Sequence, residues 1–310
     1  MASDQERPLL GILLKVASVL AFVVMSALLK AAEGVPAGEL VFFRSAFAIF
    51  PVIIFLAWRR QLSAGVRTSN LPGHFLRGLV GVISMGLGFY ALTKLPLPES
   101  VSLGYAMPLF VVMFSALFLK ERVHLFRWTA VLVGLAGVGI MVWPRLTVFS
   151  GQQAMGTDEA YGVIAAMIAA AFAAWAMLQV RRLTRTERTE TIVFYFSISA
   201  AVLALFTVPF GWVWPTPQQA VLLVLSGFVG GVAQILLTSS YRYAAPSLVA
   251  PFEYSSLLLS LVIGYFAFGD VPTVMMLVGA TIVMTSGIAV ILREHRLGLD
   301  RAKSRAANTL

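Results

Sequence analysis

Two ionisable side chains lie within apolar stretches of this sequence, where a charge is costly and usually serves a function. Glu253 follows Pro251 in the run Ala-Pro-Phe-Glu-Tyr-Ser-Ser at 250–256, and Arg44 lies in the run Val-Phe-Phe-Arg-Ser-Ala at 41–46. A guanidinium keeps its charge and needs an anion, carbonyl oxygens or water. We therefore expect Glu253 to bind substrate or to form a structural ion pair. We expect Arg44 to bind an anionic substrate group or to extend toward lipid headgroups.

Aromatic and polar side chains in neighbouring apolar stretches are the other candidates for a binding site. Aromatic rings stack on planar ligands, and an amide or hydroxyl group inside an apolar helix needs a hydrogen-bond partner. Together with Glu253 and Arg44, the expected substrate-binding residues are Tyr105, Tyr254, Trp175, Gln234, Tyr90 and Ser84. For the aromatic residues, the alternative role is ordinary packing in the helical core.

Two prolines indicate breaks in the helices that carry the two central tyrosines. Pro108 comes after Tyr105, and Pro251 comes before Tyr254. Proline removes a backbone donor and kinks a helix, which leaves carbonyl groups free to meet a ligand. Broken helices at corresponding positions in the two halves of a membrane protein indicate a binding site near the middle of the bilayer.

Other kinds of chemistry lack the residues that they require. The chain has no cysteine, and its three histidines lie in polar, arginine-rich segments without a second histidine at metal-ligand spacing. We expect His74, His124 and His295 to be solvated loop residues, and we expect neither a metal site nor a cofactor. The sequence contains no phosphate-binding loop and no H-E-x-x-H motif, and a Ser/His/Asp triad would need a histidine inside the bilayer. The sequence therefore predicts that the protein is not an enzyme.

The elements that must position these residues are apolar runs long enough to span a membrane. Hydrophobic residues make up 59% of the 310-residue chain and charged residues only 12%, and the mean hydropathy is +0.87. Soluble domains contain about 25% charged residues, so this composition argues against a soluble enzyme and a disordered protein. A spanning helix needs about 20 mostly apolar residues. Runs of this kind predict ten helices, at 9–30, 39–58, 75–93, 100–119, 126–142, 160–178, 191–210, 220–241, 247–268 and 273–292.

The positions of Lys and Arg predict the orientation of these helices. When the helices alternate in direction, 19 of the 23 Lys and Arg residues fall on the side of the two chain ends, three fall on the opposite side, and Arg44 lies within a span. Basic loops stay in the cytoplasm, so we expect a multi-pass protein of a bacterial-type inner membrane with both termini cytoplasmic. The net charge of +9 is then a topology signal with secondary binding of membrane lipids. It gives no reason to expect nucleic-acid binding.

The two halves of the chain align as an internal repeat. Matching residues recur at an offset of 151 in the early helices and 149 in the later ones: Gly11 with Gly162, Glu39 with Glu190, Gly78 with Gly227, Gly81 with Gly230, and Tyr105 with Tyr254. We assign the first five-helix repeat to 9–142, the second to 160–292 and a mobile basic cytoplasmic tail to 293–310. An odd number of helices inverts the second repeat in the membrane. The predicted fold is an all-α integral membrane protein of ten transmembrane helices in two inverted-topology five-helix repeats, which is typical of secondary transporters that work by alternating access.

Short motifs in both repeats resemble those of a known family. They are E-L-V-F-F-R-S-A-F at 39–47, L-F-L-K-E-R-V at 117–123 and the degenerate copy F-G-D at 268–270. With its predicted helices and inverted repeats, the chain resembles the drug/metabolite transporter (DMT) superfamily, EamA family, over 9–292. The resemblance implies a central cavity between the repeats and transport of amino acids, nucleotide precursors, vitamins or other metabolites.

Two segments favour a particular substrate within this superfamily. R-P-L-L-G-I at 7–12 and G-E-L-V-F-F-R-S-A-F at 38–47 are similar to the corresponding segments of riboflavin importers and S-adenosylmethionine carriers. The likeness favours riboflavin uptake. The residues expected to line a riboflavin site are Tyr105, Tyr254, Trp175, Gln234 and, as acceptor for the ribityl hydroxyls, Glu253.

Other substrates and one function without transport are alternatives. An exporter of amino acids or related metabolites would hold the substrate carboxylate with Arg44 and the amine with Glu253. A carrier of S-adenosylmethionine or another nucleoside-like metabolite is a further alternative. A membrane scaffold or receptor has less support, because such proteins rarely use inverted repeats. Glu253 allows proton coupling, facilitated diffusion fits equally well, and a homodimer is one oligomeric state that we consider.

Overall fold

The computed structural model describes residues 8–118, 125–146, 157–183, 186–244 and 250–307, and over these residues every regular element is a helix. The first half contains α1 (Pro8–Ala31), α2 (Ala37–Trp58), the short α3 (Leu62–Val66), α4 (Leu71–Lys94), α5 (Leu97–Gly104), α6 (Met107–Phe118) and α7 (Leu125–Leu146). The second half contains α8 (Thr157–Leu183), α9 (Thr189–Leu205), the 3-10 turn η2 (Val208–Phe210), α10 (Pro217–Tyr243), the 3-10 segment η3 (Ala250–Tyr254), α12 (Ser255–Ile263), the π-helical turn η4 (Gly264–Phe268) and α13 (Val274–Ala307). The all-α prediction is confirmed.

The surface of the bundle is apolar in a way that suits lipid. Five helices, α1, α2, α4, α8 and α10, are long and apolar enough to cross a membrane, and shorter apolar helices lie in α7, in α9, in α12 with its flanking turns, and in α13. Large apolar side chains are exposed along these helices, for example Ile54 of α2, Leu132 of α7 and Leu258 of α12. Water disfavours contiguous exposed surface of this kind, whereas the hydrocarbon core of a bilayer accepts it.

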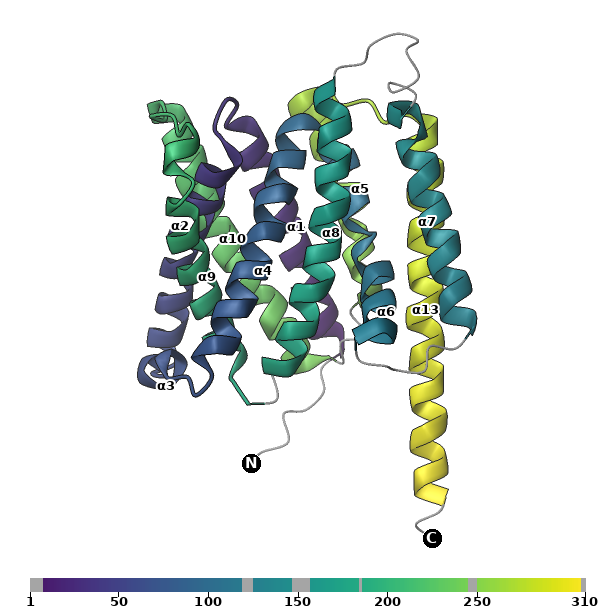
Figure 1. The fold of residues 1–310 in the computed structure, drawn as a ribbon. Coiled ribbons are helices and arrows are strands. Elements are labelled where there is room, and N and C mark those ends of the chain that lie inside the picture. The colour runs from purple at the N-terminus through teal and green to yellow at the C-terminus, as the bar shows by residue number, and fades with distance from the viewer. Residues whose placement is uncertain (1–7, 119–124, 147–156, 184–185, 245–249, 308–310) are drawn as a thin grey trace.

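The helices pack as two related sets. α1 packs along α10 as α8 packs along α4, and α2 packs against α10 as α9 packs against α4. In addition, α2 packs against α9, and α7 lies beside α13 at one edge of the bundle (Figure 1). In the internal repeat, α1 corresponds to α8, α2 to α9, α4 to α10 and α7 to α13. Each packed pair of helices in one repeat therefore has an equivalent packed pair in the other. Two copies related by an axis in the membrane plane produce this pattern.

Aligned glycines allow the same close approach in both repeats. Gly78 of α4 lies against Ser199 of α9, and a Cβ added to the glycine would come within 2.7 Å of the Ser199 Cβ. Gly227 of α10 lies against Phe47 of α2, and an added Cβ would come within 2.3 Å of the Phe47 Cβ. Only a residue without a side chain lets these helices approach so closely, and the packing role of both glycines is therefore confirmed.

The predicted helices at 100–119 and 247–268 are broken rather than continuous. In the first repeat, α5 and α6 meet at Tyr105, whose amide group donates to the carbonyl oxygen three residues earlier. In the second repeat, a 3-10 segment that contains Pro251 precedes α12. An α-helix cannot keep all its hydrogen bonds through Pro108 or Pro251, because proline has no amide hydrogen. The breaks predicted from these prolines are confirmed.

The last helix is longer than predicted. α13 continues to Ala307, so residues 293–307 of the predicted tail extend it as helix, and it projects beyond the bundle on the side of α3 (Figure 1). We call this side the arginine-rich face. Its connections and helix ends carry Arg59, Arg60, Arg67, Arg182 and Arg188.

Candidate substrate-binding site

Arg44 points into the bundle. The residue is only 6% exposed, and it lines a small pocket between α2, α9 and α10 together with Phe196, Ser197 and Gln234. Gly230 of α10 lies on the same pocket wall, and a Cβ added there would come within 2.7 Å of the Met25 Sδ. The Arg44 Nε has no hydrogen-bond partner among the described residues. The structure therefore holds a cation at the wall of a pocket inside the bundle.

A second, partly buried guanidinium lies next to the first. The Arg77 guanidinium carbon lies 4.2 Å from the centre of the Phe196 ring, and the Arg44 guanidinium carbon lies 6.0 Å from the same point. The two carbons are therefore at most about 10 Å apart. Arg77 folds along its own helix over Gly81, where an added Cβ would come within 2.0 Å of the Arg77 Nη1. Both Nε and Nη1 of Arg77 are buried without a hydrogen-bond partner in the described part of the chain.

Neither arginine has an acidic partner among the described residues, where the ion pairs involve other side chains. Arginine keeps its proton in proteins, so the site carries two positive charges. At a separation of about 10 Å and an effective dielectric constant of about 20, their repulsion is about 2 kcal/mol. An anion between them would offset both this repulsion and the cost of burying the charges.

The site lies between the two faces of the bundle. At 1.5 Å per residue, Arg44 lies about 10 Å from the start of α2, and Arg77 lies about 9 Å from the start of α4. The two helices start at opposite faces, so the side chains reach Phe196 from opposite directions. Arg44 and Gln234 are predicted site residues that the structure brings together. Arg77 and Phe196 were missed by the sequence analysis.

Glu253 has a different partner. Its carboxylate forms an ion pair and a hydrogen bond with the ammonium group of Lys15 on α1. The Lys15 side chain is 3% exposed, whereas that of Glu253 is 52% exposed. The contact joins the first repeat to the second, and it agrees with the structural ion pair that was one of the two expectations for Glu253.

The two central tyrosines contact each other. The rings of Tyr105 and Tyr254 lie 5.1 Å apart in an edge-to-face arrangement, and the Tyr105 hydroxyl lies 2.5 Å from the Ser256 Oγ. Both tyrosines are buried in one hydrophobic cluster with residues such as Val138 and Met276. They occupy the point where the broken helices meet, and each ring packs against the other.

The remaining predicted residues lie on α4 and α8. Ser84 donates a hydrogen bond of 2.9 Å to the Ala169 carbonyl oxygen and so joins α4 to α8. Trp175 is 41% exposed and packs on Phe172. Tyr90 lies beneath the ammonium group of Lys94, which is 5.9 Å from the ring centre. These contacts are with neighbouring helices and side chains.

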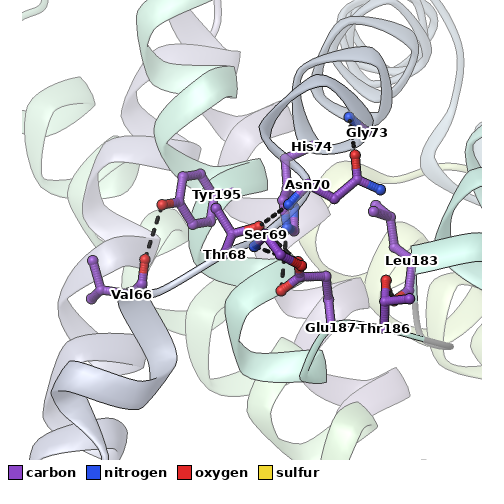
Figure 2. A network of polar contacts seen from close by, with 10 residues as sticks. All are labelled: Val66, Thr68, Ser69, Asn70, Gly73, His74, Leu183, Thr186, Glu187 and Tyr195. Carbon is purple, nitrogen blue, oxygen red and sulfur yellow. Dashed lines mark hydrogen bonds and ion pairs between the residues drawn. The ribbon is translucent and has the colours of Figure 1, made fainter.

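A polar network at the arginine-rich face joins the two repeats (Figure 2). Glu187, between α8 and α9, accepts hydrogen bonds from the Thr68 hydroxyl at 2.8 Å and from the Ser69 amide at 3.0 Å. The Tyr195 hydroxyl donates to the Val66 carbonyl oxygen at 2.9 Å. Although burial opposes ionisation, the hydrogen bonds from Thr68 and Ser69 and the nearby His74 hold the pKa of Glu187 below its usual value.

His74 belongs to this network, and the expectation of a solvated loop residue is wrong for it. Its ring is 2% exposed and stacks on Tyr195 with centres 4.7 Å apart. Its Nε2 lies 3.9 Å from the Glu187 Oε2. The residue falls inside α4 because the helix starts at Leu71, earlier than predicted. His124 lies outside the described residues.

The opposite face carries its own contacts between the repeats. Asp270 accepts a hydrogen bond of 2.9 Å from the Leu97 amide and lies 3.9 Å from the ammonium group of Lys30. Glu39 of α2 accepts a hydrogen bond of 3.1 Å from the Val213 amide. Polar contacts thus join the repeats at both faces, and the two arginines lie between them.

Comparison with known families decides the class of protein. A model of the EamA-like transporter family matches residues 9–143 and, separately, residues 160–293. The chain belongs to the EamA-like transporter family. The duplicated match agrees with the paired helix packing, and it confirms the resemblance seen in the sequence motifs.

Similar proteins have different printed substrates. The EamA-like chain is 32% identical to the pseudopaline exporter CntI of Pseudomonas aeruginosa, over 90% of this chain and 95% of that one. It is 28% identical to a riboflavin transporter of Vibrio cholerae, over 92% and 93% of the two chains, and 27% identical to an S-adenosylmethionine uptake transporter of Rickettsia bellii, over 83% and 84%. These relatives are named as transporters, in agreement with the prediction of a non-enzyme.

A solved structure described as "Crystal structure of protein" has the same fold as this EamA-like chain. It superposes with a TM-score of 0.63 at 22% identity, covering 93% of this chain and 98% of that one. At this identity the likeness concerns the fold alone.

Proposed function

We propose that this EamA-like transporter carries a small metabolite that bears a carboxylate group, such as an amino acid or a related compound, by alternating access. The observation that carries the proposal is Arg44, which is buried beside a cavity without an acidic partner among the described residues. A carboxylate matches the planar fork of a guanidinium with two parallel hydrogen bonds. Gln234, on the cavity wall, adds an amide that can donate and accept.

The proposed location is a bacterial-type inner membrane with both termini in the cytoplasm. The arginine-rich face supports this orientation through the bias of basic residues toward the cytoplasm. In Figure 1, α13 ends on the side of α3, which is the side where α1 begins. Both chain ends on one side fit an even number of crossings.

The substrates suggested by the sequence differ in their fit to Arg44. Riboflavin carries no carboxylate, and Tyr105 and Tyr254, which the sequence assigned to its ring system, pack edge-to-face against each other. S-adenosylmethionine and free amino acids carry a carboxylate and therefore supply the counter-charge.

Uptake into proteoliposomes tests the proposal. Labelled amino acids, S-adenosylmethionine and riboflavin are offered one at a time to the purified full-length chain and to two variants, Arg44→Gln and Arg182→Gln. We expect saturable uptake of a carboxylate-bearing compound, a loss of at least about tenfold in Arg44→Gln, and unchanged uptake in Arg182→Gln, which removes an exposed arginine. Uptake of riboflavin alone, unaffected by Arg44→Gln, would overturn the proposal, and the absence of any flux would favour a scaffold or receptor.

A further inference from the structure

We propose that the substrate carries two carboxylate groups, and that Arg77 of α4 binds the second one. This inference rests on the proposed function, in which Arg44 binds the first carboxylate. The two residues form what we call the arginine pair, and both lie close to the Phe196 ring.

The Arg77 side chain has nitrogen atoms that are free to bind an anion. Two of its nitrogen atoms, Nε and Nη1, are buried and have no hydrogen-bond partner in the described part of the chain. Its described contact is the face of the Phe196 ring, 4.2 Å from the guanidinium carbon. A ring face attracts a cation but accepts no strong hydrogen bond, so the donors of Arg77 stay available to a ligand.

The shared ring places both guanidinium groups at one site. Their carbon atoms are at most about 10 Å apart. A carboxylate bound fork-to-fork holds its carbon about 4 Å from the guanidinium carbon, given hydrogen bonds of about 2.8 Å. A ligand that binds both groups therefore needs its two carboxylates close together, and a dicarboxylate with a short chain can reach both guanidinium groups from one side of the pair.

A glycine on α4 leaves space for the Arg77 side chain. A Cβ added to Gly81 would come within 2.0 Å of the Arg77 Nη1 and within 2.7 Å of the Phe196 Cε2. Its counterpart at the offset of 149, Gly230, lines the pocket together with Arg44 and Phe196. Equivalent positions of the two repeats thus adjoin the arginine pair.

Charge balance favours a dianion over a monoanion. One carboxylate compensates one guanidinium and leaves the other buried charge unmatched, whereas a dicarboxylate compensates both. An unmatched buried charge is strongly unfavourable, so the second carboxylate should tighten binding by about tenfold or more. The amide of Gln234 on the same wall can bind a further polar group of such a ligand.

Paired ligands provide the test. The probes are the dicarboxylates malonate, succinate, glutarate and adipate, and the amino acids L-aspartate and L-glutamate. Each is compared with its monoamide, which is L-asparagine or L-glutamine for the two amino acids. The readouts are the melting temperature of the purified full-length chain and, for members that bind, inhibition of uptake into proteoliposomes. We expect at least one dicarboxylate to bind about tenfold or more tightly than its monoamide.

Substitutions then assign the preference to Arg77. In Arg77→Gln the dicarboxylate should bind only about as tightly as its monoamide, and the monoamide should still bind. Arg44→Gln should weaken the binding of both ligands. Arg182→Gln, at an exposed arginine, should leave both affinities unchanged. Where Arg77→Gln does not fold, Gly81→Ala replaces it, because the added Cβ would come within 2.0 Å of the Arg77 Nη1 and displace that group.

The outcomes separate this inference from the proposed function. The role of Arg77 is overturned if the dicarboxylate still binds more tightly than its monoamide in Arg77→Gln, or in Gly81→Ala where that is the variant used. The role is also overturned if no dicarboxylate in the panel binds more tightly than its monoamide. If Arg44→Gln still weakens carboxylate binding in these cases, the proposed function stands alone. Binding that neither arginine affects overturns both.

Discussion

Replacing Glu187 by Gln should loosen the arginine-rich face. The carboxylate oxygen Oε1 accepts three hydrogen bonds, from the Thr68 hydroxyl and from the amide and hydroxyl of Ser69, at 2.8 to 3.1 Å. A hydrogen bond to a charged group contributes about 1.5–3 kcal/mol and a neutral one about 0.5–1.5 kcal/mol. Because the two Ser69 bonds are exposed to solvent, we expect the three bonds together to lose only about 1–2 kcal/mol of stabilisation when the charged acceptor becomes neutral. The population open at this face should then rise about 5- to 30-fold.

A single introduced thiol can report this change. The chain has no cysteine, so Ser197→Cys, at a cavity wall position that is 2% exposed, provides the sole thiol. A membrane-impermeant maleimide is added to vesicles that present the arginine-rich face outward. The labelling rate should rise with the open population in Glu187→Gln and stay unchanged in the control Glu33→Gln, which alters an exposed carboxylate at the opposite face. Equal rates in Glu187→Gln and the parent would refute the idea that this network holds the face closed.

Three further predictions follow from individual contacts. Because the pKa of Glu187 is lowered in the folded protein, the ionised carboxylate stabilises the fold fully above the ordinary carboxyl pKa of 4.5. This stabilisation is lost as the pH falls through the lowered pKa. Between neutral and acidic pH, the melting temperature of Glu187→Gln should therefore fall less than that of the parent protein. Gly227→Ala should destabilise the protein by about 1–3 kcal/mol, because its Cβ would meet that of Phe47 at 2.3 Å. In the same melting experiment Gly86→Ala, with nothing within 4 Å of its added Cβ, should have little effect, and equal losses would contradict the packing account. Trp175→Ala should leave carboxylate uptake within about twofold, since its ring is 41% exposed and packs on Phe172; a selective loss of riboflavin uptake would instead support the flavin assignment.

Much of the fold could be predicted because its signals are local. Apolar runs of sufficient length predict membrane helices, and Pro108 and Pro251 predict breaks because they lack an amide hydrogen. The repeat was visible as a near-constant offset between glycines such as Gly78 and Gly227. The exact ends of the helices were less accessible, and the earlier start of α4 at Leu71 moved His74 from a supposed loop into a buried network.

The candidate site depends on contacts between distant segments, which the sequence does not display. Arg44 was recognisable because it lies deep within an apolar run. Arg77 lies close to a helix end, and its role emerges only when α9 places Phe196 beside it. One local signal could have singled it out: Arg77 precedes Gly81 by one helical turn, which leaves space for its side chain to fold along α4.

Tyr105 and Tyr254 occupy equivalent positions in the two repeats, and each is the other's neighbour. A residue can touch its own counterpart only where the axis relating the two copies passes close by. The tyrosine pair therefore lies near the axis that relates the two repeats, and we expect it to move little when the repeats exchange conformations. In the alternating-access cycle proposed above, spin labels at the two faces should change their separations in opposite senses. A pair of labels beside the tyrosines should keep the same separation throughout the cycle. That separation can serve as the reference for displacements elsewhere in the transporter.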